Sequence, residues 1–349
     1  MKKIGILGCG RISQVRHIPE LAENPHAQLV GYYNPTTSRA EQMAAKYGGK
    51  VYKDIDELIN DPEIDAVLVC LANQAHASVT IQALKAGKDV LCEKPMATTL
   101  EECEAMIAAA KESGKTLMIA QNQRLTAAHR KAREMISEGK IGKVLTFRTT
   151  FGHSGPEMWS IAQSKGTWFF DKKKAAMGVM ADLGIHKTDL IQYLLDENIV
   201  KVSANLTTLD KTGEDGKPIC VDDNAICIYT MESGVIGTMT ASWTYYGAED
   251  NSTIIYGTEG ILRIYDHPQY AIQWIKKNQE CINIDAEPIQ TNDNQTKSGM
   301  TDLFIDTLEN HSESELSAER VLPAMRAIFA AIQSNKEGKA IEILANRRQ

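Results

Sequence analysis

A glycine turn near the start of the chain limits the possible folds more than any other stretch. The apolar run Ile4 to Leu7 leads into Gly8-Cys9-Gly10, and a helical pattern begins directly afterwards. This order of strand, tight turn and helix N-terminus is typical of a site that binds a dinucleotide pyrophosphate. Gly8 permits a sharp turn with positive φ, and Gly10 leaves room for a phosphate because it has no Cβ. The unpaired amides of the helix would then face the anion.

The first third of the chain alternates between apolar runs and helical patterns. After the first strand we expect strands over 28–33, 66–71, 89–92 and 116–120, and helices over 11–23, 39–47, 56–60, 77–86 and 100–113. Such alternation predicts a doubly wound parallel sheet, in which ligands bind beyond the carboxyl ends of the strands. The residues expected at those ends are Gly8, Asn34, Asn73, Glu93, Lys94 and Gln121.

The pattern changes from about residue 123 to short strands in succession. We expect a connecting helix over 127–138, a strand over 143–151, an aromatic loop over 152–174 and a helix over 178–195. The strands expected next are 200–209, 224–231, 235–245, 253–257, 261–265, 271–276 and 281–284, and helices over 303–308 and 318–334 close the chain. The prediction is an α/β Rossmann domain over 1–122 and an α+β domain over 123–349 with a large, mostly antiparallel open sheet.

Composition excludes several classes of partner. The net charge is −7, and Lys172 to Lys174 is the only basic tract, which argues against nucleic acid and anionic membranes. No run of 18 apolar residues is present, so we expect no membrane span, and the run before Gly8 is too short for a signal peptide. The expected location is the cytoplasm.

The cysteines support that location. Their number, seven, is odd, and they form no Cys-x-x-Cys motif. We therefore expect reduced, mostly buried thiols and no metal site, since the spacing needed for zinc ligands is absent.

Lys94 stands at the end of an expected buried strand, between Glu93 and Pro95. Neighbouring apolar residues would desolvate its ammonium group, and Pro95 restricts Lys94 to extended geometry. Glu93 can pair with this ammonium or hold a cofactor group. The plainer alternative is a salt bridge at the sheet edge, which would be favoured without the glycine motif.

A second candidate is the helical stretch that contains Asp182, His186 and Asp189. Asp182 and His186 are four residues apart and so share one helix face. A carboxylate that orients an imidazole provides a general base that works near neutral pH. A surface ion pair or a capping network is the commoner outcome for such a pair, and a metal site would need a ligand from elsewhere.

The cofactor preference depends on the residues that follow the second strand. An acid about 20 residues past the glycines usually holds the ribose hydroxyls of NAD, but Asn34 stands here and cannot repel a 2′-phosphate. Ser38 and Arg39 could receive that phosphate, or Ser38 could simply cap a helix. We expect NAD, with NADP possible, because Arg39 is the only basic residue nearby in the sequence.

Several ring-bearing residues have two interpretations. His76 lies near the expected cofactor edge, although it could serve only to start a helix. Five further side chains could contact a sugar ring: His153, Trp159, Trp168, Trp243 and Tyr245. Core packing explains any one of these aromatic side chains equally well.

Together these motifs resemble the glucose–fructose oxidoreductase/inositol dehydrogenase/rhizopine-catabolism (Gfo/Idh/MocA) family over essentially the whole chain. The resemblance rests on residues 8–12, on Asn73-Gln74-Ala75-His76, on residues 83–95 and on residues 182–189. Glu93-Lys94-Pro95 combined with Asp-x-x-x-His is the specific part. The chain departs from the family pattern at Ser13, Asn34 and Leu71-Ala72.

The resemblance implies an NAD(P)-dependent oxidoreductase that acts on a sugar, a polyol or a cyclitol. It implies that Lys94, Asp182 and His186 are catalytic, and that the second sheet forms a homodimer or homotetramer. The implied cofactor-binding residues are Gly8, Gly10, Arg11, Ile12, Asn34, Ser38, Arg39, Leu71, Asn73, His76, Glu93, Lys94 and Gln121. The implied substrate-binding residues are Lys94, Arg124, His153, Trp159, Trp168, Asp182 and His186.

Two other functions use the same scaffold. One is an NAD-dependent glycosidase that oxidises a sugar transiently and releases an aglycone, for which the long aromatic loop would give room. The other is a non-catalytic module that senses NAD(P), which would have no need of Lys94, Asp182 and His186.

Overall fold

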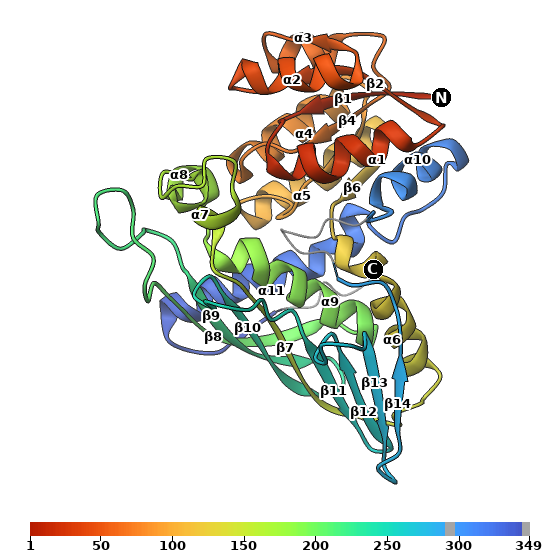
Figure 1. The fold of residues 1–349 in the computed structure, drawn as a ribbon, viewed down its shortest axis with the longest axis vertical. Helices are drawn as coiled ribbons and strands as arrows, with labels where there is room; N and C mark the ends of the chain where they lie inside the picture. Colours follow the sequence, from red (N-terminus) through yellow and green to blue (C-terminus); the bar gives the residue numbers. More distant parts are fainter. Residues whose placement is uncertain (290–296, 344–349) are drawn as a thin grey trace. The chain divides into compact units, whose positions relative to one another are not determined.

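The structure is a computed structural model, which describes residues 1–289 and 297–343 (Figure 1). The described chain forms two compact units. Unit 1 contains Met1–Asn122, Lys173–Ala176 and residues 297–322. Unit 2 contains Gln123–Lys172, Met177–Ile289 and residues 323–343. The first segment of unit 1 thus ends at Asn122, and two later segments also belong to this unit.

Unit 1 is built on a parallel sheet of six strands. Their order, β3-β2-β1-β4-β5-β6, is the doubly wound order, in which the chain reverses direction of winding beside β1. The strands are β1 (Lys2–Leu7), β2 (Ala27–Tyr33), β3 (Lys50–Val51), β4 (Ala66–Val69), β5 (Asp89–Cys92) and β6 (Leu117–Ile119). All four residues of β4 are buried, as a strand covered on both faces requires.

The connecting helices of unit 1 follow each strand in turn. They are η1 (Ser13–His17, a π-helical turn), α1 (Ile18–Glu23), α2 (Thr37–Tyr47), α3 (Ile55–Asn60), η2 (Asn73–Ala75), α4 (His76–Lys85) and α5 (Leu100–Ser113). α5 starts with a capping box, because the Thr99 hydroxyl accepts from the Glu102 amide and the Glu102 carboxylate accepts from the Thr99 amide. Gly114 ends α5 in the left-handed conformation.

Two later segments complete unit 1. α10 (Met300–Asn310) lies beside α1, where the Asn24 side-chain amide donates to Asp302 at 2.6 Å. Ser317 forms an isolated bridge with Met118 of β6. The short helix α8 (Lys172–Ala175) is held by Asn73, whose Nδ2 atom donates to the Ala175 carbonyl at 2.9 Å.

Unit 2 is built on a nine-stranded sheet in the order β14-β13-β12-β11-β7-β10-β9-β8-β15. The strands are β7 (Val144–Gly152), β8 (Ile199–Thr207), β9 (Asn224–Met231), β10 (Ile236–Ser242), β11 (Thr253–Gly257), β12 (Gly260–Ile264), β13 (Ile272–Lys276), β14 (Cys281–Ile284) and β15 (Ile341–Glu342). All of its strand pairs are antiparallel apart from β7 and β10, which run in parallel. This arrangement confirms the predicted fold class.

One face of this sheet packs on helices and the other carries exposed side chains. The helical segments are η3 (Asn122–Leu125), α6 (Ala127–Ser137), α7 (Pro156–Trp159), η4 (Trp168–Phe170), η5 (Met180–Gly184, a π-helical turn), α9 (Ile185–Leu195) and α11 (Ala318–Glu337). In β9, Ala225, Cys227 and Tyr229 are buried while Ile226 and Ile228 are exposed. This alternation follows from the two-residue period of a strand.

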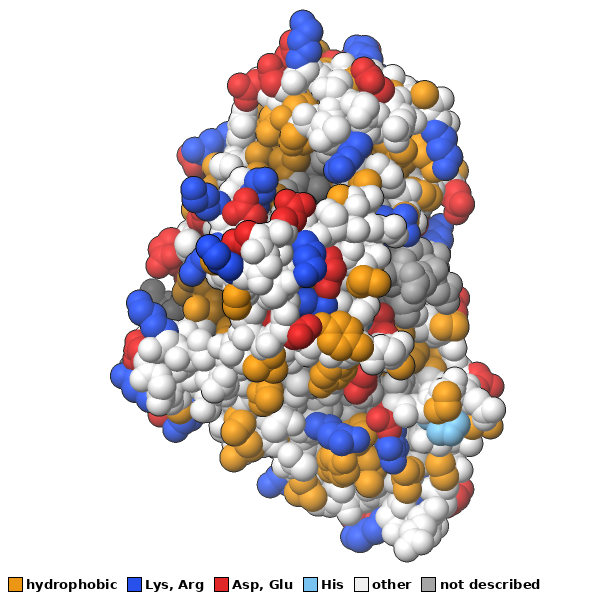
Figure 2. All heavy atoms as spheres, turned by 60° about the vertical axis from the view of Figure 1, so that its left-hand side comes forward, with side chains coloured by type: hydrophobic (Ala, Val, Ile, Leu, Met, Phe, Trp, Pro, Cys, Tyr) orange, Lys and Arg blue, Asp and Glu red, His pale blue; other side chains and the backbone are white. Residues whose placement is uncertain are grey.

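The surface shows no large area of one charge sign in the view of Figure 2, where acidic and basic side chains alternate with apolar ones. Within the described part of the chain, no helix combines the length and the apolar character that crossing a membrane requires.

Candidate active site

The glycine turn has the geometry that its sequence predicts. Gly8 has a φ angle of +107°, and a Cβ atom on it would lie 2.3 Å from the Cys70 carbonyl oxygen. Alanine therefore cannot replace Gly8 without moving the main chain of unit 1. A Cβ atom on Gly10 would meet nothing within 4 Å, so there is open space in front of this residue. Arg11 follows with an exposed side chain and Ile12 with a partly buried one.

Ser13 and Asn34, both departures from the family pattern, hold the glycine turn in place. The Ser13 hydroxyl donates to the Gly8 carbonyl at 2.6 Å, a bond that glycine or alanine could not make. The Asn34 side chain accepts from the Cys9 amide at 2.9 Å and donates to the Thr36 carbonyl at 2.9 Å. Asn34 thus shapes the turn and the loop after β2 by two bonds to the main chain.

The N-terminus of α2 has no side-chain cap. Thr36 is the N-cap residue but makes no side-chain capping bond, and the first turn holds no acidic residue. Ser38 is exposed and does not cap the helix, while Arg39 is partly buried and close enough to Cys9 to affect the pKa of that thiol. Burial raises the pKa of Cys9 to about 12, and the charge of Arg39 opposes that rise.

Glu93 and Lys94 lie at the carboxyl end of β5. The two roles predicted for Glu93 stay predictions, and the structure adds a contact that was not predicted: its carboxylate binds His17 of η1, with 2.6 Å between His17 Nε2 and Glu93 Oε1. Its other oxygen, Oε2, accepts from the Lys94 amide at 3.0 Å. Glu93 therefore fixes the main chain of Lys94. Sequence reasoning did not find His17, because no spacing rule links the first helix to the fifth strand.

His76 ties two strand ends together. Its Nδ1 atom lies 2.8 Å from the Pro95 carbonyl and its Nε2 atom lies 3.0 Å from the Leu71 carbonyl. Burial lowers the pKa of His76, and its two bonds to the main chain oppose that change. The ring nitrogens have main-chain partners, which corresponds to the alternative of a structural role at the start of α4.

Gln121, two residues after the end of β6, is 1% exposed, and neither polar atom of its side chain has a partner among the described residues. A buried carboxamide without hydrogen bonds is costly. Gln121 therefore lies where a polar group of a ligand would be stabilised.

In unit 2, the predicted Asp182–His186 helix consists of the π-helical turn η5 and then α9. Asp222, a residue that sequence reasoning missed, holds its start: the two carboxylate oxygens accept from the amides of Gly178 and Met180 at 2.9 and 2.8 Å. π-helical turns occur often at functional sites. The helix that carries Asp182 and His186 is thus anchored at its first turn by a carboxylate from outside the helix.

Asp182 and His186 are each 7% exposed. The indole Nε1 of Trp243 donates to Asp182 Oδ2 at 3.0 Å, so Trp243 is buried structural support and its predicted sugar contact is not the role the structure shows. The His186 ring lies 5.9 Å from the ring of Phe151 on β7. The structure therefore places both predicted catalytic side chains in a helix that is buried on all sides.

The other side of α9 is filled by a buried ion pair. Arg124 donates from Nε and Nη2 to the two oxygens of Asp189, at 2.7 and 2.5 Å. Arg124, predicted to bind substrate, is thus a partner of Asp189 in the core of unit 2. Burial raises the pKa of Asp189, and Arg124 opposes that rise.

Lys187 lies next to His186 and is completely buried. Its Nζ atom donates to the Asn251 carbonyl at 2.9 Å, and burial lowers its pKa to about 7, although the charges of Asp250 and Glu249 raise it.

The aromatic loop between β7 and η5 forms a continuous set of ring contacts. His153 lies edge-on to Phe151 and to Trp159, Trp159 contacts Phe169, and Phe169 stacks on Trp168 with 3.9 Å between ring centres. His153 also accepts from the Gly155 amide at 3.0 Å. Three of the predicted substrate residues, His153, Trp159 and Trp168, therefore belong to one cluster.

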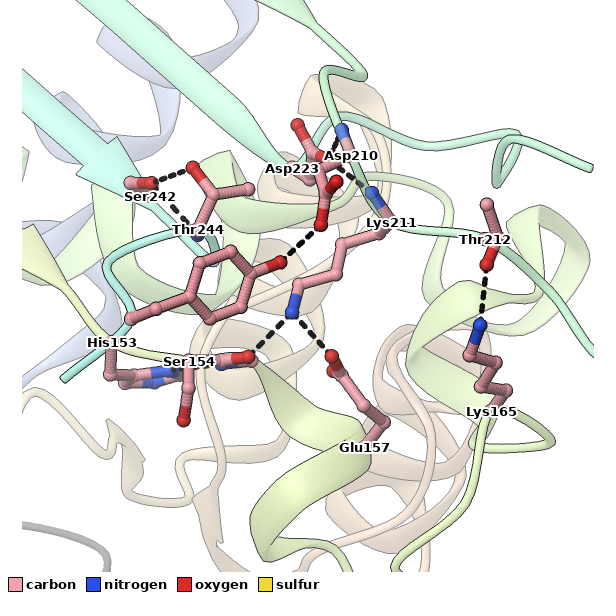
Figure 3. A network of polar contacts seen from close by, with 12 residues as sticks. His153, Ser154, Glu157, Lys165, Asp210, Lys211, Thr212, Asp223, Ser242 and Thr244 are labelled. Carbon is pink, nitrogen blue, oxygen red and sulfur yellow. Dashed lines mark hydrogen bonds and ion pairs between the residues drawn. The ribbon is translucent and has the colours of Figure 1, made fainter.

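Figure 3 shows how this loop is fastened to the loop after β8. The Lys211 ammonium group donates to the Ser154 carbonyl at 2.6 Å and pairs with Glu157. Asp223 accepts from the amides of Asp210 and Lys211, and Lys165 donates to Thr212 at 2.6 Å. The aromatic loop is thus held at both its beginning and its middle.

No group of three or more His, Cys, Asp or Glu side chains in residues 1–289 and 297–343 could hold a metal ion.

Comparison with known proteins assigns both units. Residues 2–121 match the model of the oxidoreductase family with an NAD-binding Rossmann fold, and residues 129–263 match the GFO/IDH/MocA C-terminal domain. The chain is 30% identical over 264 residues to 1,5-anhydro-D-fructose reductase of Ensifer adhaerens, with 75% of each chain covered. It is also 30% identical over 261 residues to myo-inositol 2-dehydrogenase of Thermotoga maritima, covering 74% of this chain and 73% of that protein.

Solved structures of related proteins have the same fold. An aldose-aldose oxidoreductase from Caulobacter crescentus in complex with glycerol matches with a TM-score of 0.83 and 26% identity, over 98% of this chain and 99% of that chain. A levoglucosan dehydrogenase in complex with NADH and levoglucosan has a TM-score of 0.87 at 23% identity over 99% and 100% of the two chains, which supports the fold. The chain belongs to the Gfo/Idh/MocA family of NAD-binding oxidoreductases, whose members act on sugars and inositols.

Proposed function

We propose that this oxidoreductase is a dehydrogenase that transfers a hydride between NAD and a carbinol or keto carbon of a sugar, polyol or cyclitol. The observation that carries the proposal is the anchored helix of unit 2. Asp222 holds its first turn, Trp243 holds Asp182, and His186 lies one turn further along the same buried helix. A buried imidazole whose surroundings are fixed in this way suits a general base.

Unit 1 fits a dinucleotide. Gly10 has open space in front of it, and Gln121 has a buried carboxamide without a partner among the described residues. Amides at a helix N-terminus bind phosphate groups, so the helix that follows Gly10 would favour a pyrophosphate in that space. Gly8, Gly10, Arg11 and Ile12 would hold the pyrophosphate, and the strand-end residues Leu71, Asn73, Glu93 and Gln121 would lie along the cofactor.

Bound NAD supplies the acceptor for the hydride of the carbinol carbon. His186 takes the hydroxyl proton, and Asp182 orients the imidazole and favours its charged form. Lys94 donates a hydrogen bond to the same oxygen and stabilises the developing alkoxide, as an oxyanion donor does. Glu93 fixes the Lys94 main chain through the bond to its amide.

A screen of NAD and NADP against inositols, aldoses and sugar acids tests this function through the near-ultraviolet absorbance of the reduced cofactor. We expect turnover with at least one polyol or sugar. Aryl glycosides form a second arm of the screen. Release of sugar from them without net NADH formation would favour the glycosidase, and tight cofactor binding without any turnover would favour a sensing module.

We propose NAD as the preferred cofactor. The Asn34 side chain already makes two main-chain bonds, and Arg39 is the one cation of the Thr36–Arg39 stretch. A neutral asparagine does not repel a 2′-phosphate, so NADP should also bind, but more weakly. The ratio of kcat/KM for the two cofactors tests this preference.

We also propose a homo-oligomer formed through the open face of the nine-stranded sheet. Ile226, Ile228 and Ile236 lie on this face and are 57%, 48% and 53% exposed. Contiguous exposed apolar residues mark protein contacts. Ile228→Lys should lower the mass in sedimentation, whereas Met158→Lys, which changes an exposed residue outside the sheet, should not. An unchanged mass in Ile228→Lys would contradict the interface.

The cysteines support a cytoplasmic location. All seven are free thiols, and Cys9, Cys92, Cys103 and Cys227 are buried. We propose that the protein works in a reducing compartment, where thiols persist. Titration of the freshly isolated, unfolded protein with a thiol reagent should find seven reactive groups.

A further inference from the structure

His17 is buried, titratable and not used by the reaction as described above. It is the last residue of η1, the π-helical turn that follows the glycine turn, and only 1% of its side chain is exposed. Burying an imidazole this completely requires polar partners.

The partner of His17 is Glu93. The distance of 2.6 Å between His17 Nε2 and Glu93 Oε1 is short for a neutral hydrogen bond and typical of one to an ionised acceptor. Because a carboxylate only accepts, Nε2 carries the hydrogen. No partner of the His17 Nδ1 atom lies among the described residues. The one hydrogen bond that the structure assigns to the His17 ring therefore goes to Glu93.

Glu93 also contacts the main chain of Lys94. Its second oxygen accepts from the Lys94 amide at 3.0 Å. One carboxylate thus bridges the helix that follows the glycine turn and the main chain of the proposed catalytic lysine.

The charges around Glu93 keep the bridge ionised. Burial acts to raise the pKa of Glu93, but the hydrogen bond and charge of His17, together with Lys94 and Arg16, lower it to about 2. The other titratable groups that Glu93 affects are His76 and the thiols Cys70 and Cys92. His17 supplies both the hydrogen bond and part of the charge, so its loss would leave a buried carboxylate with one contact fewer.

We propose that His17 is a positioning residue for Lys94, acting through Glu93. His17 holds the carboxylate in the orientation in which it binds the Lys94 amide, and that amide sets where the Lys94 side chain leaves the sheet. The inference rests on the catalytic role of Lys94 that is proposed above. A misplacement of about 1 Å at such a position is expected to cost on the order of 10²-fold in rate.

The test compares His17→Leu with His17→Gln, each in the native chain and in a Lys94→Ala background. His17→Leu keeps the volume but removes the donor, whereas His17→Gln keeps an N–H group. We expect His17→Leu to lower kcat by about 10- to 100-fold with the affinity for NADH, measured by its fluorescence, changed less than about threefold. His17→Gln should recover most of kcat.

The Lys94→Ala background separates positioning from general packing. If His17 acts through Lys94, His17→Leu should change the residual rate by less than about twofold when Lys94 is absent, because the two losses overlap. Equal losses in both backgrounds would overturn the proposal and leave His17 a packing residue. Full kcat in His17→Leu would overturn it as well.

His26→Leu is the matched control. His26 also pairs with a glutamate of unit 1, Glu309, at 3.1 Å, but the two side chains are 59% and 30% exposed. The His26→Leu substitution should leave kcat unchanged. If His17→Leu does not fold, Glu93→Gln in the same two backgrounds decides the question. If Lys94→Ala alone keeps normal turnover, the proposed role of Lys94 fails, which is a different result from failure of the His17 inference.

Discussion

The two units hold their functional side chains in different ways. In unit 1 the main chain shapes the site. Space is open at Gly10, and neither the Gln121 carboxamide nor the His17 Nδ1 atom has a partner among the described residues. In unit 2, side chains from outside the helix hold the predicted catalytic face, with Asp222 at its start and Trp243 on Asp182.

This difference matches the two tasks that we propose. A cofactor is recognised largely by main-chain amides and by polar side chains, which unit 1 provides at the ends of its strands. A general base must keep one orientation through each turnover, so its surroundings are built in advance. Substitutions in unit 1 should therefore act on binding and those in unit 2 on turnover, with Lys94 and the residues that position it, Glu93 and His17, as the exception.

The largest expected effects are those of substitutions at the two proposed catalytic residues Lys94 and His186. Lys94→Ala and His186→Ala should each lower kcat by about 10²- to 10⁴-fold, because each removes a group that moves or stabilises charge. The dissociation constant of NADH should change only a few-fold in both. Steady-state rates on the best substrate of the screen, together with a fluorescence titration, measure the two quantities. Near-normal turnover in either variant would refute its assigned role.

Gly8→Ala should lower the stability of unit 1, whereas Gly10→Ala should lower its affinity for NADH. At Gly8 the new Cβ meets the Cys70 carbonyl at 2.3 Å and the φ angle is +107°, so the free energy of unfolding should fall by at least about 2 kcal/mol. At Gly10 nothing lies within 4 Å, so stability should hold while NADH binds more weakly. Denaturant unfolding and NADH titration distinguish the pair. Equal loss of stability in both would contradict the open space at Gly10.

Lys187→Met should stabilise unit 2. Burial lowers the pKa of Lys187 from its ordinary value of 10.5 to about 7. Between these values the unfolded chain binds more protons than the folded chain, so this residue makes stability rise with pH. Removing the charge should therefore raise the free energy of unfolding by about 1 to 2 kcal/mol below pH 7, and by less as the pH approaches 10. Denaturant unfolding at several pH values measures this, and a gain independent of pH would contradict a buried charge.

The smallest expected effect concerns cofactor choice. Asn34→Asp places a carboxylate at the end of β2, where it should repel a 2′-phosphate. The preference for NAD over NADP, expressed as the ratio of kcat/KM, should rise about tenfold, equivalent to about 1.4 kcal/mol. Arg39→Ala should lower kcat/KM with NADP and leave that with NAD nearly unchanged. A loss with both cofactors in equal measure would show that Arg39 does not face a 2′-phosphate.

Local patterns predicted most elements well. β5, α5, β9, β11 and β14 have the predicted bounds, since caps, turns and apolar runs of adequate length mark them in the sequence. β3 and β15 were missed because each has two residues and no period of its own. The return of residues 297–322 to unit 1 was also missed, because it depends on contacts such as Asn24 with Asp302 between residues far apart in the chain.

Only part of the candidate site could likewise be predicted from the sequence. Lys94, Asp182 and His186 stand in compact motifs and were named from the sequence. Their supports were not, because each is brought in by the fold: His17 reaches Glu93 from 76 residues away, and Trp243 reaches Asp182 from 61 residues away. Arg124 was predicted to bind substrate, and its ion pair with Asp189 of α9 was not predicted, because the fold brings the two residues together from 65 positions apart.

Direct transfer of hydrogen is the measurement closest to the central claim. A substrate deuterated at the reacting carbinol carbon is incubated with NAD, and the reduced cofactor is analysed by mass spectrometry. If His186 removes the hydroxyl proton while the hydride leaves, the deuterium should appear in the reduced cofactor and turnover should slow. Deuterium released to water, or product formed without any labelled cofactor, would contradict the proposed dehydrogenase.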